Sequence, residues 1–111
     1  MEYRRGDIVN VDFGRKNIKG SEQRGDRPAL IVQNDIGNKF SSTLIVASIT
    51  KKNKSLPTHV LIEELFHTSI VACEQIKTID EKRISKKIGS ISEEKMLEVN
   101  NALSVSLGLK I

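Results

Sequence analysis

The chain has 111 residues and a formal net charge of +4, a length typical of one domain with a single core, so we expect one domain over residues 1–111. No apolar run approaches the roughly 20 residues needed to span a bilayer, and no apolar stretch follows the first charged residues, so we expect neither a membrane segment nor a signal peptide. Cys73 is the only cysteine, which excludes a disulfide framework and favours a reducing cytoplasm.

The first part of the chain predicts two strands separated by a long polar loop. Side chains alternate from Ile8 to Phe13, which indicates a half-buried strand. Residues 14–26 are polar and contain several glycines, and a loop of this length in a small domain is often functional. An apolar strand is predicted at 29–33, and the turn-forming residues at 34–38 are expected to reverse the chain.

The middle of the chain predicts more strands. Residues 44–49 are apolar almost throughout, which indicates a central strand that ends at Thr50. A short strand is predicted from Pro57 through Ile62, and another over 69–76. Residues 78–91 are expected to form a helical turn and one short strand.

The last segment predicts an amphipathic helix of about four turns. Ser92 is a suitable N-cap, and Gly108 is a natural residue to end the helix. Apolar residues recur between them at helical spacing: Met96, Val99, Ala102, Leu103 and Leu107. Short strands followed by one terminal helix predict a mainly β protein, a small and strongly bent antiparallel sheet or barrel that carries a helix.

Arg27 is the strongest candidate for a functional residue. Pro28 favours an extended conformation at Arg27, which would place the guanidinium where the polar loop meets the sheet. A permanent cation beside a polar loop is suited to hold a phosphate. The plainer interpretation is a strand-end arginine in a surface salt bridge.

Thr50 would complete a site if the strands at 29–33 and 44–49 are antiparallel neighbours, because Arg27 and Thr50 would then meet at one sheet edge. With Glu22 of the loop, they would place a cation, a hydroxyl and a carboxylate around one point. Displacement at a phosphodiester requires such groups, because charge grows on the phosphoryl oxygens and a proton must move.

Other features of the sequence leave alternatives open. Lysines and arginines cluster in the predicted loops, either as solvated side chains or as a positive surface for a polyanion. His59 and His67 lack the spacing of a metal site, and Cys73 lies among apolar residues, as a small core residue does. Gln75 is either a solvated strand end or a side chain that reads a base edge.

Taken together and in order, several segments of the chain resemble the MazF/PemK family of toxin endoribonucleases, most closely its firmicute members. The segments are Arg5–Val9, Gly20–Gln23, Arg27–Asp35, Thr50, Pro57–Val60, Glu74–Asp80 and Ser106–Leu109. The resemblance implies an SH3-like small barrel, a homodimer and the toxin of a type II toxin–antitoxin module. It also implies an mRNA interferase that needs no metal or other cofactor. Such an enzyme cleaves single-stranded RNA at a short sequence by 2′-hydroxyl attack, leaving a 2′,3′-cyclic phosphate and a 5′-hydroxyl.

The resemblance also implies roles for individual residues and partners. Arg27 and Thr50 correspond to the family's catalytic pair, and Glu22 to a loop carboxylate implicated in some members. The RNA-binding residues that it implies are Ser21, Gln23, Arg24, Asn34, Gln75 and Lys77. An antitoxin of the MazE type, with an acidic and initially disordered tail, would lie across the RNA groove. DNA would be contacted only through a toxin–antitoxin repressor complex.

The chain departs from the family pattern at two places. The Glu63–Thr68 connection is short, with His67-Thr68 where an acidic residue often precedes the serine, and Lys77 replaces a common arginine. Because an arginine is a poor base, Arg27 is expected to stabilise charge or donate a proton. The group that takes the 2′-hydroxyl proton stays open.

The sequence is also compatible with two other functions. The same barrel occurs in the gyrase inhibitor CcdB, although this chain ends without the exposed aromatic residue that we would expect of such an inhibitor. The other alternative is an RNA-binding module that has lost its chemistry. The presence of both Arg27 and Thr50 argues against that alternative.

Overall fold

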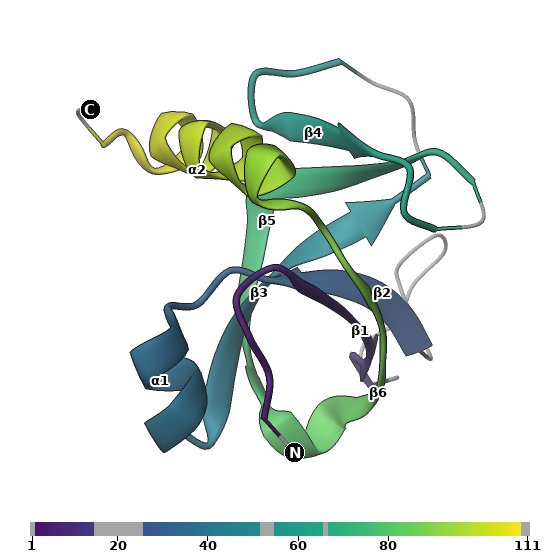
Figure 1. The fold of residues 1–111 in the computed structure, drawn as a ribbon, viewed down its shortest axis with the longest axis vertical. Helices are drawn as coiled ribbons and strands as arrows, with labels where there is room; N and C mark the ends of the chain where they lie inside the picture. Colours follow the sequence, from purple (N-terminus) through teal and green to yellow (C-terminus); the bar gives the residue numbers. More distant parts are fainter. Residues whose placement is uncertain (1, 15–25, 52–54, 66, 110–111) are drawn as a thin grey trace.

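The structure is a computed structural model that describes residues 2–14, 26–51, 55–65 and 67–109. Within these residues, strands form one antiparallel sheet in the order β4-β5-β3-β2-β1-β6 (Figure 1). The strands are β1 (Asp7–Asp12), β2 (Asp26–Ile31), β3 (Thr43–Thr50), β4 (His59–Ile62), β5 (Ser69–Asp80) and β6 (Ile84–Ser90). The helices are α1 (Asp35–Phe40), the 3-10 helix η1 (Glu81–Arg83) and α2 (Glu93–Leu107).

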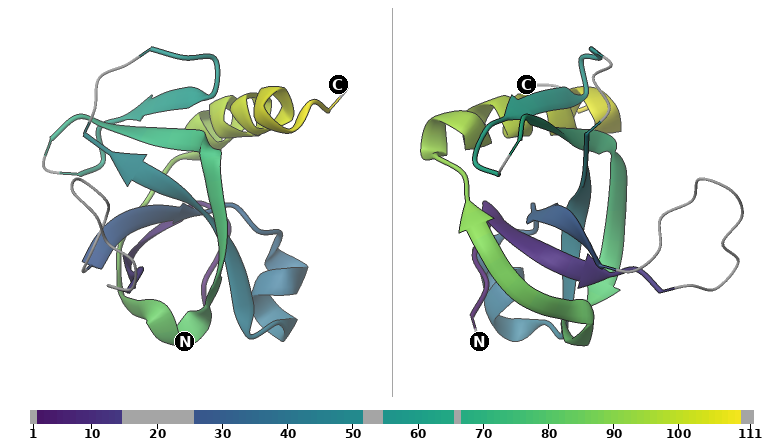
Figure 2. Two further views of the ribbon diagram at one scale, coloured as in Figure 1. Left: turned by 180° about the vertical axis from the view of Figure 1, so that it is seen from behind. Right: turned by 90° about the vertical axis from the view of Figure 1, so that its right-hand side faces the viewer.

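The sheet is strongly bent, and α2 packs beside β4 and β5 (Figure 2). This confirms the predicted class, a mainly β fold with a C-terminal helix. None of the helices in the described ranges is long and apolar enough to cross a bilayer.

The bent sheet carries an apolar cluster on each face. Ile8, Leu30 and Ala47 belong to the cluster that also contains Val99 and Ala102 of α2. The other cluster contains the neighbouring strand residues, which are Val9, Val11, Ala29, Ile31, Leu44, Val46 and Ile79. In the first predicted strand Val9 and Val11 are buried, Asn10 is partly buried and Asp12 is exposed, so the predicted alternation is present, and Ile8 adds burial at the start of the other face.

Helix α2 begins and ends as the sequence predicts. The Ser92 side chain accepts a hydrogen bond from the Lys95 N–H at 3.1 Å, which makes Ser92 the N-cap. Gly108 adopts a left-handed conformation with φ +69° at the C-terminal end. Val99 and Ala102 are buried, but Leu107 is 59% exposed, so the apolar face that we expected to include Leu107 ends before it.

Three other predictions differ in detail. The turn predicted at 34–38 is the start of α1, where the Asn34 side chain accepts a hydrogen bond from the Gly37 N–H at 2.8 Å and caps the helix. Strand β2 begins at Asp26 rather than at residue 29. Strand β5 continues to Asp80 because its second half pairs with the beginning of β3.

Strand β5 changes direction at an irregularity in its pairing with β3. Ala47 lies opposite Ile76, whereas the next residue, Ser48, lies opposite Ala72. Residues 73–75 are therefore left outside the ladder. A bulge of this kind bends a strand, and it allows one strand to serve both halves of the bent sheet.

Candidate active site

The pairing of β2 with β3 brings Arg27 and Thr50 together. Ala29 lies opposite Ser48, and Ile31 opposite Val46, in an antiparallel ladder. Continuing this register by two residues sets Arg27, near the start of β2, opposite Thr50 at the end of β3. The antiparallel arrangement expected from the sequence is thus present.

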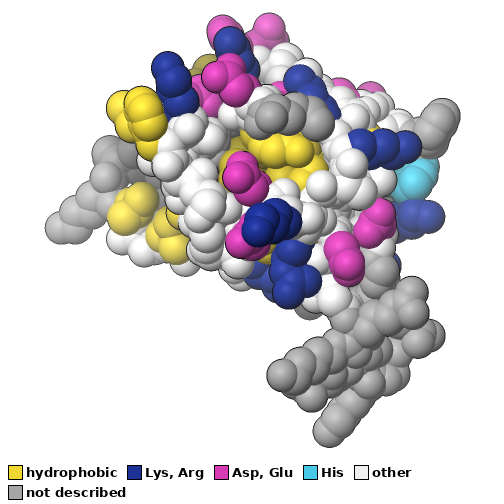
Figure 3. Space-filling view, turned by 90° about the horizontal axis from the view of Figure 1, so that it is seen from below, with side chains coloured by type: hydrophobic (Ala, Val, Ile, Leu, Met, Phe, Trp, Pro, Cys, Tyr) yellow, Lys and Arg dark blue, Asp and Glu magenta, His cyan; other side chains and the backbone are white. Residues whose placement is uncertain are grey.

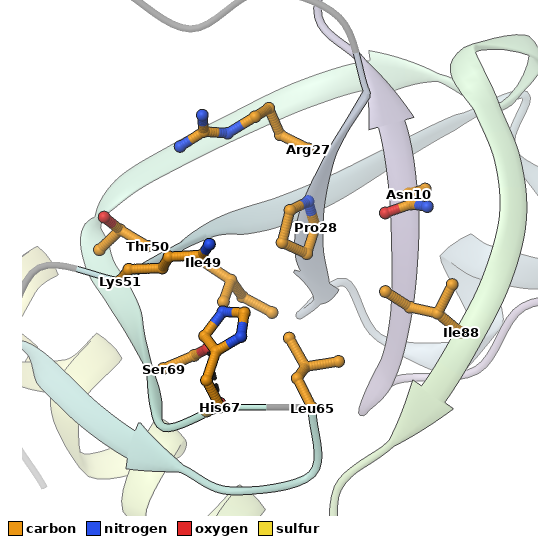
Figure 4. A pocket seen from close by; sticks show the side chains of 10 residues that line it. All are labelled: Asn10, Arg27, Pro28, Ile49, Thr50, Lys51, Leu65, His67, Ser69 and Ile88. Atoms are coloured by element: carbon orange, nitrogen blue, oxygen red, sulfur yellow. Dashed lines mark hydrogen bonds between the residues drawn. The ribbon is translucent and has the colours of Figure 1, made fainter.

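Arg27 and Thr50 line one pocket of about 520 Å³ (Figure 4). Its apolar lining comes from Pro28, Ile49, Leu65 and Ile88, and its polar lining from Asn10, Arg27, Thr50, Lys51, His67 and Ser69. Figure 4 shows the Arg27 guanidinium extending along the same side of the pocket as Thr50. Five strands (β1, β2, β3, β5 and β6) and two connections therefore contribute to one cavity.

The charged lining of this pocket is cationic. Arg27 and Lys51 line it, and none of its lining residues in the described part of the chain is acidic. On the face seen in Figure 3, by contrast, Lys and Arg side chains are interspersed with Asp and Glu. The pocket, more than that face, is therefore suited to an anion such as a phosphate.

The connection between β4 and β5 places His67 in this pocket, a residue that sequence reasoning did not assign to the site. Leu65 packs against the apolar cluster beneath α2. Ser69 is buried, and its hydroxyl donates a hydrogen bond to the His67 carbonyl oxygen at 3.2 Å. His67 is exposed between these two anchors, and its ring is directed into the pocket (Figure 4). In the sequence, the departure from the family pattern at His67-Thr68 was the feature that could have pointed to His67 as a pocket residue.

The other predicted site residues lie elsewhere. Asn34 caps α1, and Gln75 is exposed in the irregular segment of β5. Lys77 is exposed, with its ammonium nitrogen 4.7 Å from the centre of the Phe13 ring. None of these three lines the pocket of Arg27 and Thr50. The predicted loop residues, Ser21, Glu22, Gln23 and Arg24, lie outside the described residues.

A second polar cluster lies where β4 meets the irregular segment of β5. The His59 Nε2 and Glu74 Oε2 atoms are 2.8 Å apart, and the Thr58 hydroxyl donates to Glu74 Oε1 at 2.8 Å. Burial alone would raise the pKa of Glu74, but hydrogen bonds from His59, the Glu74 backbone and Thr58 outweigh it and lower the pKa. Beside Glu74, burial raises the pKa of the Cys73 thiol to about 11, so this thiol is a core residue rather than a nucleophile.

Comparisons with known proteins agree with this geometry. A profile of the PemK-like, MazF-like toxins of type II toxin–antitoxin systems matches residues 4–107. The chain is 51% identical over 112 residues to the endoribonuclease MazF of Staphylococcus epidermidis, covering 96% of this chain and 92% of that protein.

Solved structures show the same fold. A mycobacterial endoribonuclease in complex with its cognate antitoxin superposes with a TM-score of 0.84 at 24% identity, covering 98% of each chain. MazF from Deinococcus radiodurans superposes with a TM-score of 0.80 at 22% identity, covering 98% of this chain and 99% of that one. By its sequence, and in agreement with its fold, the chain belongs to the PemK-like, MazF-like toxin family of type II toxin–antitoxin systems.

Proposed function

We propose that this protein, a toxin endoribonuclease of the MazF type, cleaves single-stranded RNA with the 2′-hydroxyl of the substrate as nucleophile. The observation that carries the proposal is the convergence of Arg27 and Thr50 on one pocket. The name of the staphylococcal relative favours cleavage over gyrase inhibition or RNA binding without chemistry. Because the substrate supplies the nucleophile, the reaction requires no metal-bound water.

Arg27 and Thr50 have distinct parts in this reaction. The Arg27 guanidinium neutralises the charge that grows on the non-bridging phosphoryl oxygens, and its planar fork suits two of them. The Thr50 hydroxyl adds a hydrogen bond to the same group. The bond between O2′ and phosphorus forms while the bond from phosphorus to O5′ breaks, leaving a 2′,3′-cyclic phosphate and a 5′-hydroxyl.

The remaining roles extend this proposal to the rest of the chain and to its partners. Glu22, Ser21, Gln23 and Arg24 would contact RNA from the loop before β2, and Asn34, Gln75 and Lys77 would select its sequence. A cognate antitoxin with an acidic tail would compete with RNA for the cationic pocket; the mycobacterial endoribonuclease with the same fold was solved in complex with its cognate antitoxin. We further propose a homodimer that acts in the cytoplasm and reaches DNA only in complex with its antitoxin.

Incubation of the purified protein with a long single-stranded RNA in excess chelator tests the reaction. We expect cleavage with 2′,3′-cyclic phosphate ends, and at least a 10²-fold loss of rate in Arg27→Ala, the scale of losing a positioned charge stabiliser. Thr50→Val should lose rate, and Thr50→Ser should retain most of it. Arg4→Ala, an exposed arginine outside the pocket, is the control. No cleavage by the wild type, or full activity in Arg27→Ala, would contradict the proposal.

A further inference from the structure

The pocket holds one side chain of the type that exchanges a proton near neutral pH. Arginine and lysine side chains, as at Arg27 and Lys51, ordinarily exchange protons only far above that range, and the other lining residues within the described ranges are amides, hydroxyls or apolar groups. Histidine is the residue whose ordinary titration falls between pH 5 and 8. His67 is therefore the one described member of the lining able to fill the role that Arg27 cannot.

The structure positions the His67 imidazole for this role. The hydrogen bond from the buried Ser69 hydroxyl to the His67 carbonyl fixes the backbone on one side, and the packing of Leu65 fixes it on the other. The ring is directed into the pocket from the wall formed by the β4–β5 connection, while Arg27 and Thr50 extend from β2 and β3 (Figure 4). A phosphate held by Arg27 and Thr50 would thus share its pocket with the imidazole.

We propose that His67 is the general base of the reaction and accepts the 2′-hydroxyl proton as O2′ attacks phosphorus. This inference rests on the proposed function and deepens it. The neutral imidazole takes the proton while the bond to O5′ breaks. O5′ then takes a proton from water, and the imidazolium returns its own to the solvent, so that no co-reactant is required.

Several charged groups lie near His67 or on the elements around it. Arg27 of β2 and Lys51 after β3 share the pocket with it. Glu63 and Glu64 of the same connection line a different pocket, together with Lys95 of α2. From β6, Lys87 is paired with Asp7 at 3.1 Å. Because arginine and lysine side chains ordinarily titrate far above neutral pH, loss of an acidic limb of the rate profile on substitution of His67 would assign that limb to His67.

The test is the pH dependence of cleavage by wild type and His67→Gln. We expect kcat to fall about 10²-fold in the variant, with KM changed little, and the acidic limb of the profile to disappear. His67→Ala should regain activity when imidazole is added to the buffer. His59→Gln is the matched control, because His59 is bound to Glu74 outside the pocket; this variant should keep the acidic limb.

Two results would overturn the role of His67. One is a His67→Gln variant that keeps both the wild-type kcat and the acidic limb. The other is a rise in KM alone, which would make His67 a binding residue. Either result, obtained while Arg27→Ala is inactive, would leave the proposed function standing. Absence of cleavage by the wild type would instead contradict the proposed function itself. Because His67 is exposed, we expect both variants to fold, and thermal unfolding would verify this.

Discussion

Glu74 has several contacts that depend on its charge. Its carboxylate is bound by the Thr58 hydroxyl and the His59 ring, and its pKa lies below the ordinary value of 4.5. A carboxyl with a lowered folded-state pKa stabilises the fold above its unfolded pKa, and this contribution is lost as pH falls through the folded value. The stabilisation is therefore complete above about pH 5 and declines on acidification below 4.5.

We predict that Glu74→Gln flattens this acid-side decline. The measurement is the free energy of unfolding by denaturant at a series of pH values from 3 to 7. The variant should be less stable than the wild type at pH 7, and the difference between them should shrink towards pH 3. Glu63→Gln, an exposed carboxylate on the neighbouring connection, should leave the profile unchanged. Parallel profiles for wild type and Glu74→Gln would refute the linkage.

The residues of the candidate site differ in how well the sequence alone predicts their place in the pocket. Arg27 is identified because Pro28 and the apolar strand behind it mark where loop meets sheet, and Thr50 because it ends a recognisable strand. Their meeting then follows from antiparallel pairing. His67 is harder to identify, because its place in the pocket depends on how the β4–β5 connection folds back over the site, with Leu65 and Ser69 as anchors. No local pattern of apolar and polar residues predicts that this connection folds over the pocket.

Among the helices and strands, too, some boundaries are set by nearby residues and others by pairing with distant segments. Helix α2 is predictable at both ends because its caps are local: Ser92 accepts from Lys95, and Gly108 takes a left-handed conformation. The length of β5 is not predictable in this way. Residues 76–80 are polar or mixed in character, and they form a strand because the first half of β3 offers them a partner. Pairing between distant segments here overrides local preference.

The end of α2 offers a test of how a local cap contributes to the stability of the element. The backbone at Gly108 has φ +69°, and the N–H of Leu109 donates to the Ser104 carbonyl at 2.9 Å. A Cβ at this position would meet no atom within 4 Å, so the cost of a side chain is backbone strain alone. For a residue other than glycine this strain is about 1 kcal/mol.

We therefore predict that Gly108→Ala lowers the free energy of unfolding by about 1 kcal/mol, and that Gly108→Asn lowers it by less, because asparagine tolerates the left-handed region. Chemical denaturation at pH 7 measures both. The control is Asn101→Ala, at an exposed position within α2, which should be neutral or slightly stabilising. Equal stability of Gly108→Ala and the wild type would show that the cap contributes nothing.

At the scale of the whole molecule, the distribution of charge matters more than its sum. A net charge of +4 produces a modest field, and on the face shown in Figure 3 charges of both signs alternate. The pocket that contains Arg27 and Lys51 has no acidic lining residue in the described ranges. RNA affinity should therefore depend on a few local cations, each of which releases counterions when it meets a phosphate.

The salt dependence of RNA binding measures this distribution. With a 2′-O-methylated single-stranded RNA, which cannot react, the logarithm of the affinity should fall linearly with the logarithm of salt concentration. Lys51→Gln should reduce the slope by about 0.7, the value for one phosphate contact on a single strand. Lys95→Gln removes a lysine paired with Glu98 on α2, so its slope should match the wild type. If both variants change the slope equally, RNA responds to the overall charge of the protein, and the pocket is not its principal contact.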